Sequence, residues 1–324
     1  MDILVTGSVA YDYLMRFPGH FADHFIGDQL HQVSLSFLVD EMTKHWGGVA
    51  ANIAFNMALL GLRPKLMGTV GRDFPDYRDW LEQAGVDTST VRQIDEVFTS
   101  SFFVNTDLDN NQIASFYGGA MAYAKNYSIA DVYDGIPSMA IISPNDPQAM
   151  QNIAKECRER GIRFIYDPSQ QVPRLTGEEL YRDMQGAHAM VVNAYEAEVI
   201  CKKTEQSLDD LRQAVEILVV THGGRGSHIY VNGETIEVPV FATAVKDPTG
   251  GGDAFRAGLI RGMVAGWPLK LAGEVGALCA TYALEHVGTQ NHRYTLPEFI
   301  IRFRSQFNDE GLLDSLLEPI SSSV

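Results

Sequence analysis

The chain has 324 residues, 45% of them hydrophobic, which is enough for a large α/β unit that carries an inserted segment. Its net charge of −16 argues against a nucleic-acid partner, although it is compatible with one anionic small molecule. The three cysteines lie far apart without a CxxC pattern, the first residues are too polar for a signal peptide, and no apolar run approaches the roughly 20 residues of a membrane span. We therefore expect a cytoplasmic protein that does not contact a membrane.

Short apolar segments alternate with longer amphipathic segments along the chain. The amphipathic segments, such as residues 148–160 and 209–216, have the period of helices, and the apolar segments have the length of strands buried on both faces. This alternation predicts an α/β fold of Rossmann-like type, with a mostly parallel central sheet and helices on both faces. The predicted strands are Ile3–Val5, Ala140–Ile142, Phe164–Tyr166, Met190–Val192 and Ile217–Val220.

Small or polar residues follow each of these strands. Because ligands of open α/β sheets bind beyond the carboxyl ends of the strands, these residues indicate where a site would form. Short polar residues also end strands that have no functional role, but five such endings together favour a site. The endings are Thr6–Ser8, Ser143–Asn145, Asp167–Ser169, Asn193 and Thr221.

Two segments interrupt the alternation, because residues 32–39 and 98–117 have the pattern of antiparallel strands. A turn-rich stretch in the middle of the second segment predicts a hairpin whose register pairs Phe102 with Phe116. The aromatic pair fits a cross-strand core contact and a ligand platform equally well. We expect these segments to form a small β lid.

The expected lid divides the chain into two domains. We place the lid in residues 13–45 and 96–120. The large nucleotide-binding and catalytic domain would then contain residues 1–12, 46–95 and 121–324. An exposed edge of the lid would also be able to pair in a homodimer.

Three consecutive glycines, Gly250, Gly251 and Gly252, precede Asp253 and a predicted helix that stops at Gly266. The N–H groups in the first turn of a helix lack intrahelical partners, and glycines let a phosphate approach them closely. A carboxylate there would repel a resting phosphate unless it accepts a proton from an attacking alcohol. The pattern therefore predicts phosphoryl transfer, with Asp253 as the base and the glycine N–H groups stabilising charge. Taken alone, an aspartate that caps a helix explains the pattern slightly better.

Three further motifs accompany this one. A glycine pair opens a second helix, and the amide of Asn52 in its first turn suits either a ligand hydroxyl or the helix start itself. Glu196, in NAYE after a strand, would be able to hold a hydrated metal near phosphate. Residues 221–226, THGGRG, follow another strand and can present N–H groups to phosphate. The sequence contains neither a P-loop nor a dinucleotide-binding fingerprint.

Together these motifs resemble the signatures of the ribokinase-like (PfkB) family of carbohydrate and nucleoside kinases. GGVAAN resembles its first signature, NAYE its NxxE motif, THGGRG its TxGxxG segment and DPTGGGDAFRAG its second signature. The resemblance, which covers nearly the whole chain, implies that Asp253 is the catalytic base, that Gly250, Gly251 and Gly252 form the anion hole, and that ATP is the phosphate donor. The ATP site implied in this way contains Asn193, Glu196, Thr221, Gly223 and Gly226.

The same resemblance implies ions in the site. Mg²⁺ would arrive with ATP and be held through water by Asn193 and Glu196. Many members of the family also bind a monovalent cation such as K⁺ beside the anion hole. Its ligands here would be Asp247 and carbonyl groups near Gly288.

Other segments, including ASFYGGAM, DPSQQ and HVGTQ, are similar to the bacterial adenosine kinases of the mycobacterial type. This similarity implies that adenosine is phosphorylated on its 5′-hydroxyl by ATP, a reaction of purine salvage that gives AMP and ADP. It implies that Phe102 and Phe116 sandwich the adenine. The other implied adenosine contacts are Asp12, Gly48 and Asn52 at the ribose hydroxyls, and Ser8, Ser36 and Gln171 in the pocket wall.

Other acceptors and other functional classes are less compatible with these residues than adenosine. A kinase for another nucleoside or for ribose is the alternative among enzymes, and a bare sugar would have no use for two facing rings. A non-catalytic nucleoside-binding protein would not need Asp253, and a dehydrogenase would need the missing dinucleotide fingerprint. Whether Arg256 faces the phosphate or packs outside the site stays open at this point.

Overall fold

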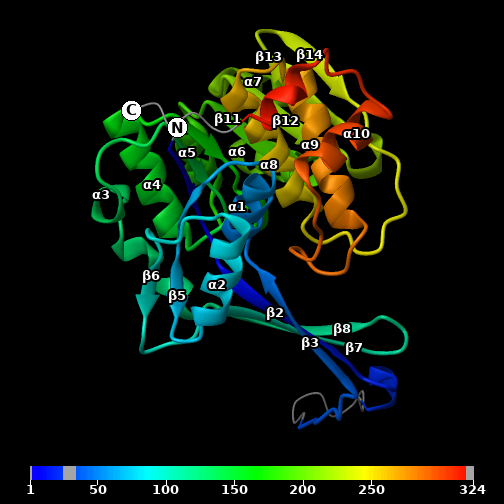
Figure 1. Ribbon diagram of the computed structural model, residues 1–324. Coiled ribbons are helices and arrows are strands. Elements are labelled where there is room, and N and C mark those ends of the chain that lie inside the picture. Colours follow the sequence, from blue (N-terminus) through cyan, green and yellow to red (C-terminus); the bar gives the residue numbers. More distant parts are fainter. Residues whose placement is uncertain (1, 25–33, 319–324) are drawn as a thin grey trace.

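The computed structural model describes residues 2–24 and 34–318, and its largest element is an eight-stranded sheet (Figure 1). The strands from β12 to β4 are parallel to one another, whereas β13 and β14 extend the sheet in antiparallel fashion. In spatial order the sheet contains β14 (Glu234–Val238), β13 (Ser227–Val231), β12 (Ile217–Thr221), β11 (Ala189–Asn193), β10 (Phe164–Tyr166), β9 (Met139–Ile142), β1 (Ile3–Thr6) and β4 (Lys65–Met67). The predicted fold class and all the predicted strands are confirmed.

Helices cover both faces of this sheet because successive strand residues point to opposite sides. In β1, Ile3 and Val5 enter the core on one face and Leu4 enters the core on the other. One face carries α1 (Val49–Leu59), α2 (Pro75–Ala84), α8 (Gly251–Ala265) and α9 (Leu269–Leu284), with α10 (Leu296–Arg304) packed beyond them. The other face carries α3 (Ile129–Val132), α4 (Pro147–Arg160), α5 (Gly177–Met184), α6 (Ala194–Thr204) and α7 (Leu208–Ala214).

A second sheet of four strands projects from this body (Figure 1). It contains, in spatial order, β3 (Glu41–Gly47), β2 (Ala10–Arg16), β7 (Ser100–Thr106) and β8 (Gln112–Tyr117). A third, two-stranded sheet pairs β5 (Thr69–Gly71) with β6 (Arg92–Ile94). The short 3₁₀ helices are η1 (Phe21–Asp23), η3 (Gly119–Asn126), η4 (Ser169–Gln171), η5 (Gly223–Arg225) and η6 (Leu312–Leu316).

The second sheet confirms one expectation and corrects another. The predicted hairpin is formed by β7 and β8, and Phe102 lies directly opposite Phe116 as its register predicts. The strand predicted at residues 32–39 is wrong, because residues 34–39 form no strand, while residues 32 and 33 lie outside the described part. Both edges of β2 are occupied, one by β3 and the other by β7, and residues 34–39 pair with neither of the outer strands of this sheet, β3 and β8.

None of the helices within residues 2–24 and 34–318 has the length and apolar character that crossing a membrane would require.

Candidate active site

A cavity of about 800 Å³ lies at the carboxyl ends of the parallel strands. In the sheet, β1 lies between β4 and β9. The chain continues from β1 to β4 on one side and returns later as β9 on the other side, so the strand order reverses at β1. Such a reversal opens a crevice in α/β sheets. All five of the predicted polar strand endings reach the cavity, through Ser8, Pro144, Ser169, Asn193 and Thr221.

The second sheet forms a further wall of this cavity. Asp12 and Leu14 of β2 lie on the same face as Phe102 of β7 and its partner Phe116 of β8. Phe116 is 53% exposed, so a large part of this apolar residue is open to solvent at the cavity. Ser36, in contrast, is exposed and does not line the cavity, so the structure does not bring it together with the other predicted pocket residues.

Asp253 lies in the first turn of α8, as the glycine pattern predicts. Gly250 and Gly252 line the cavity beside it. Gly250 has a φ of 80°, in the left-handed region that glycine adopts without strain. Gly251 instead faces the protein interior, where a Cβ would lie 2.9 Å from Leu284. The start of this helix therefore presents a carboxylate and backbone N–H groups to the same space.

Asn52 connects this carboxylate to the other side of the cavity. Its Nδ2 donates to Asp253 Oδ2 at 2.8 Å. Its Oδ1 accepts from Thr289 Oγ1 at 2.8 Å and from Gln290 Nε2 at 2.9 Å, which fixes the orientation of the amide. Burial raises the pKa of Asp253, although the Arg256 charge and the Asn52 hydrogen bond oppose the shift.

Asp12 projects into the cavity past Gly47. A Cβ at Gly47 would lie 2.5 Å from Asp12 Oδ2, so only glycine leaves room for this carboxylate. Burial raises the pKa of Asp12 to about 6, and the nearby Asp253 and Asp247 add to the shift. A partly desolvated carboxylate of this kind is a strong acceptor for hydroxyl groups.

Three of the other predicted pocket residues also line the cavity. Gly48, with a φ of 92°, lies directly before α1, and Ser8 Oγ accepts from the N–H of Val49 at 3.0 Å. Gln171 is 7% exposed, and its Oε1 has no hydrogen-bond partner among the described residues. A buried acceptor without a partner is costly, so Gln171 Oε1 is suited to a donor group of a ligand.

Asn193 and Glu196 line the cavity and also form a capping box at the start of α6. Asn193 Oδ1 accepts from the N–H of Glu196, and Glu196 Oε2 accepts from the N–H of Asn193, both at 2.8 Å. In the described part of the chain no three His, Cys, Asp or Glu side chains cluster as metal ligands. Asn193 and Glu196 therefore fit Mg²⁺ only through water. Waters and phosphate oxygens would supply most of the ligands of the ion, as is usual for Mg²⁺ in proteins.

One of the three other predicted ATP residues lines the cavity. Thr221 lines the cavity at the end of β12, whereas Gly223 and Gly226 shape the turn η5 behind it without lining the cavity.

Asp247 Oδ2 accepts from the N–H of Gly288 at 2.9 Å, which brings both predicted cation neighbours together beside the cavity. Burial opposes the change, but backbone hydrogen bonds lower the pKa of Asp247 and keep it charged.

The structure also brings residues into the site to which sequence analysis had assigned no definite role. Thr289 and Gln290 orient Asn52, and their only signal was their place in the HVGTQ segment. Arg256 lines the cavity, and its guanidinium forms an ion pair with Asp167, which follows β10. The spacing of three residues from Asp253 on a helix is the sequence signal that could have placed Arg256 beside the carboxylate.

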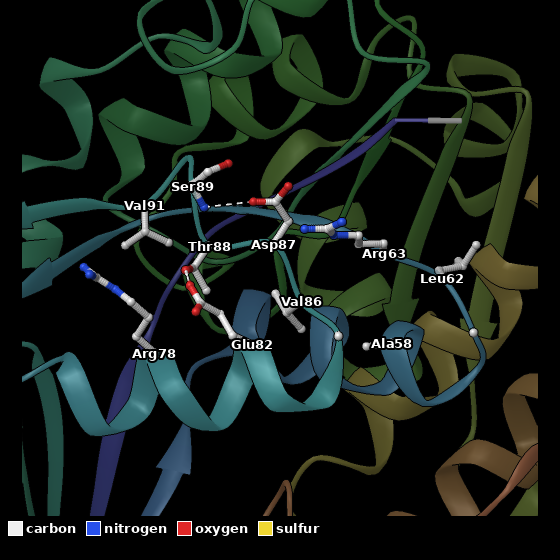
Figure 2. A pocket seen from close by; sticks show the side chains of 12 residues that line it. Ala58, Leu62, Arg63, Arg78, Glu82, Val86, Asp87, Thr88, Ser89 and Val91 are labelled. Carbon is white, nitrogen blue, oxygen red and sulfur yellow. Dashed lines mark hydrogen bonds between the residues drawn. The ribbon is translucent and has the colours of Figure 1, made fainter. Parts of the chain in front are cut away.

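A second hollow, of about 770 Å³, lies between the ends of α1 and α2 and contains none of the predicted site residues (Figure 2). Its carboxylates already have protein partners. Asp87 accepts from the N–H of Ser89 and from Lys65 Nζ, each at 3.0 Å, and Glu82 accepts from Thr88 Oγ1. The first cavity, in contrast, contains the polar strand endings together with the carboxylates of Asp12 and Asp253.

Comparisons with known proteins agree with this geometry. Residues 5–295 match the family described as pfkB family carbohydrate kinase. A nucleoside kinase of Methanothermobacter thermautotrophicus is 31% identical over 314 residues, which cover 95% of this chain and 97% of that protein. The structure of Burkholderia thailandensis nucleoside kinase in complex with inosine is 36% identical with a TM-score of 0.83, and covers 95% of this chain and 98% of its own. Methanocaldococcus jannaschii nucleoside kinase, an archaeal member of the ribokinase family, is 28% identical with a TM-score of 0.83, at coverages of 94% and 98%. This chain therefore belongs to the pfkB family of carbohydrate kinases and has the ribokinase fold.

Proposed function

We propose that this protein is an ATP-dependent nucleoside kinase that phosphorylates the 5′-hydroxyl of adenosine to give AMP, a reaction of purine salvage. One observation carries the proposal. A single cavity is lined both by the paired rings of Phe102 and Phe116 and by Asp253 at the start of α8. The rings suit a flat base, and the helix start suits a phosphoryl group. The nucleoside kinases among the relatives support a nucleoside as the acceptor.

In this proposal the second sheet acts as a lid that holds the nucleoside. Phe102 and Phe116 stack on the adenine, and Gln171 Oε1 accepts from its amino group. Asp12 accepts from the ribose hydroxyls, which form short charge-assisted hydrogen bonds to a carboxylate. Gly48 lies close to the same sugar because it has no side chain in the way.

The phosphoryl step is assigned to the start of α8. Asp253 accepts the proton of the 5′-hydroxyl while that oxygen attacks the γ-phosphorus of ATP and the bond to the ADP oxygen breaks. Asn52 holds Asp253 Oδ2 at 2.8 Å and so aims the carboxylate. The N–H groups of Gly250, Gly251 and Gly252 stabilise the charge on the transferring group.

The remaining residues are assigned to ATP and its ions. Thr221, Gly223 and Gly226 would contact the nucleotide, and Asn193 and Glu196 would hold Mg²⁺ through water. When bound, Mg²⁺ neutralises charge on the phosphates. A monovalent cation such as K⁺ would bind beside Asp247 and Gly288.

Inosine is a second candidate acceptor, because the Burkholderia thailandensis relative is described in complex with it. The two nucleosides differ at the 6-position of the base, where adenosine carries an amino donor and inosine an oxygen acceptor. Ribose is the alternative outside the nucleosides. Measuring kcat/KM for adenosine, inosine, cytidine and ribose by ATP-dependent ADP release tests the proposal, and phosphorylation of ribose alone would contradict it.

Replacing Phe102 with Ala separates a base platform from a structural contact. Stacking of a base on one aromatic ring contributes about 1–3 kcal/mol, so adenosine should bind roughly 5- to 150-fold more weakly. Ribose, which has no base, should be used poorly by both proteins. Isothermal titration of adenosine and a melting curve on the same sample provide the measurement. The control is Phe103→Ala, which removes the neighbouring ring that stacks on Tyr13 at 4.8 Å, away from the cavity lining. Unchanged adenosine affinity with a lower Tm would contradict the platform.

Lowering the pH should weaken adenosine binding because Asp12 titrates near pH 6. Its raised pKa of about 6 means that the carboxylate is charged above this pH and protonated below it. The KM for adenosine should therefore be constant from pH 7 to 8 and rise by roughly tenfold per pH unit below 6, while the KM for ATP changes less. Steady-state kinetics between pH 5 and 8 measure both values. Asp12→Asn is the control, since its KM should be high and should not vary through the same window. A flat wild-type profile down to pH 5 would be inconsistent with Asp12 as the ribose ligand.

A further inference from the structure

Arg256 is held between two carboxylates beneath the start of α8. Its side chain is 9% exposed. Nη2 donates to Asp167 Oδ1 at 2.7 Å, and Nε lies 2.7 Å from Asp167 Oδ2. On the other side, Nη1 lies 3.7 Å from Asp253 Oδ1. Because Asp167 is fully buried after β10 and contacts the guanidinium at two atoms, Arg256 is anchored to the sheet.

Gly252 makes room for this guanidinium. A Cβ at Gly252 would lie 2.8 Å from Arg256 Nη1. Gly252 does not have a positive φ, so backbone freedom does not account for a glycine at this position. The space that its missing side chain leaves is the space that Arg256 occupies next to Asp253.

Most charged groups near Asp253 are acidic, which would favour protonation of its carboxylate. Burial raises the pKa of Asp253, Glu196 adds to the shift, and the charge of Arg256 opposes it. The charged or titratable groups that face Asp253 or line its cavity are Arg256 of α8, Asp167 after β10, Glu196 of α6, Asp12 of β2, His45 of β3, Asp247 before α8 and Arg174 after η4. Of these groups, Arg256 is the cation that lies beside the Asp253 carboxylate, with its Nη1 3.7 Å from Asp253 Oδ1.

We infer that Arg256, anchored by Asp167, is a positioning residue that keeps the Asp253 carboxylate charged and turned toward the acceptor hydroxyl. Asn52 holds one carboxylate oxygen at 2.8 Å, and Arg256 attracts the other. This inference rests on the proposed function, in which Asp253 is the base. It assigns to the buried pair a role in the ionisation of the base, in addition to its role in the packing of α8 against the sheet.

The test compares Arg256→Gln, Arg256→Lys and Asp167→Asn with the wild type. The pH dependence of kcat is measured with saturating adenosine and ATP. Carbon NMR of aspartate carboxyl groups follows the titration of Asp253, whose signal is identified by its loss in Asp253→Asn. Without Arg256 the pKa of Asp253 should rise by about one unit or more, and the acidic limb of kcat should move upward by the same amount. Arg256→Lys should restore most of the wild-type profile.

The variants separate charge from anchoring. In Asp167→Asn the Arg256 charge remains, so the acidic limb should not move upward, but kcat should fall because the guanidinium has lost its anchor. The KM for adenosine should change less than kcat in Arg256→Gln and in Asp167→Asn. Since Arg256→Gln leaves a buried carboxylate without its partner, the double variant Arg256→Gln/Asp167→Asn repeats the measurement without that unpaired charge.

Arg261→Gln is the matched control. Arg261 is also a buried arginine of α8, but its Nε donates to the carbonyl of Leu60 at 3.3 Å and its guanidinium lies over Trp267. The variant should leave the pKa of Asp253 and the kcat profile unchanged. A folded double variant with a wild-type Asp253 titration and a wild-type kcat would overturn the inference. If the wild type phosphorylates no nucleoside, the proposed function fails, while the NMR titration still decides whether Arg256 controls the ionisation of Asp253.

Discussion

Asp253→Asn should lower kcat for adenosine phosphorylation by roughly 10²–10⁴-fold, the usual contribution of a positioned general base. The amide cannot accept the proton of the 5′-hydroxyl, although it has nearly the same shape as the carboxylate. Its side-chain oxygen can still accept the hydrogen bond from Asn52 Nδ2, so the local structure should persist. Adenosine affinity should also persist, because the base and ribose contacts proposed above come from other residues. Single-turnover kinetics and isothermal titration measure the two properties separately.

Asp210→Asn provides the control for this substitution. Asp210 occupies the third position of α7, the same helix position that Asp253 occupies in α8. It is exposed, and its Oδ2 accepts from the N–H and the hydroxyl of Ser207, the N-cap residue of its own helix. Its replacement should leave kcat unchanged, because Asp210 does not line the cavity. The free energy of unfolding should change by less than about 0.5 kcal/mol, as is usual for surface substitutions. If Asp253→Asn retains more than about a tenth of the wild-type kcat, the loss is smaller than a base would cause and Asp253 is not the base.

Asp12→Ala should raise the KM for adenosine by roughly 10²–10⁴-fold and leave the KM for ATP nearly unchanged. The estimate follows from two charge-assisted hydrogen bonds to ribose hydroxyls, each of about 1.5–3 kcal/mol. Removing the carboxylate also removes a charge from a buried position. The free energy of unfolding of the variant should therefore be no lower than that of the wild type. Initial-rate kinetics with either substrate varied, together with urea unfolding, measure these effects.

Two comparisons make the Asp12 result specific. In the wild type, 2′-deoxyadenosine should lose part of the same binding energy, because it lacks one of the hydroxyls. Glu41→Ala removes another acidic side chain from the same sheet, at the opposite end of the β2–β3 pairing, and should leave both KM values unchanged. Equal KM values for adenosine and its 2′-deoxy form in the wild type would show that Asp12 does not bind the ribose.

Local patterns were sufficient to predict much of the fold. The buried strands were recognisable because parallel strands covered on both faces have continuous apolar segments, and the register of β7 and β8 followed from a short turn between them. The strand edges of β2 could not be assigned in the same way. Whether Glu41–Gly47 or the preceding segment pairs with β2 depends on contacts across the whole sheet rather than on either sequence.

The connections within the site were also beyond local patterns. Asn52 and Asp253 are 201 positions apart, and Asp167 and Arg256 are 89 positions apart, yet each pair forms a hydrogen bond. Sequence reasoning placed these side chains near strand ends and helix starts, but the pairing of particular atoms requires the packed core. Asn193 and Glu196 show the opposite case. Sequence analysis assigned both residues to a ligand, but their capping box at the start of α6 also accounts for both without any ligand.

The exposure of β8 has an evolutionary consequence. All six of its side chains are exposed, including Phe116, whereas α8 and the strands of the main sheet are mostly buried. Substitutions on β8 should therefore change folding stability little, typically within about 0.5 kcal/mol, while they alter what the acceptor pocket contacts. Substitutions around Asp253 disturb a packed helix. Descendants of such a chain can diverge in the acceptor they use more readily than in the phosphoryl transfer they perform.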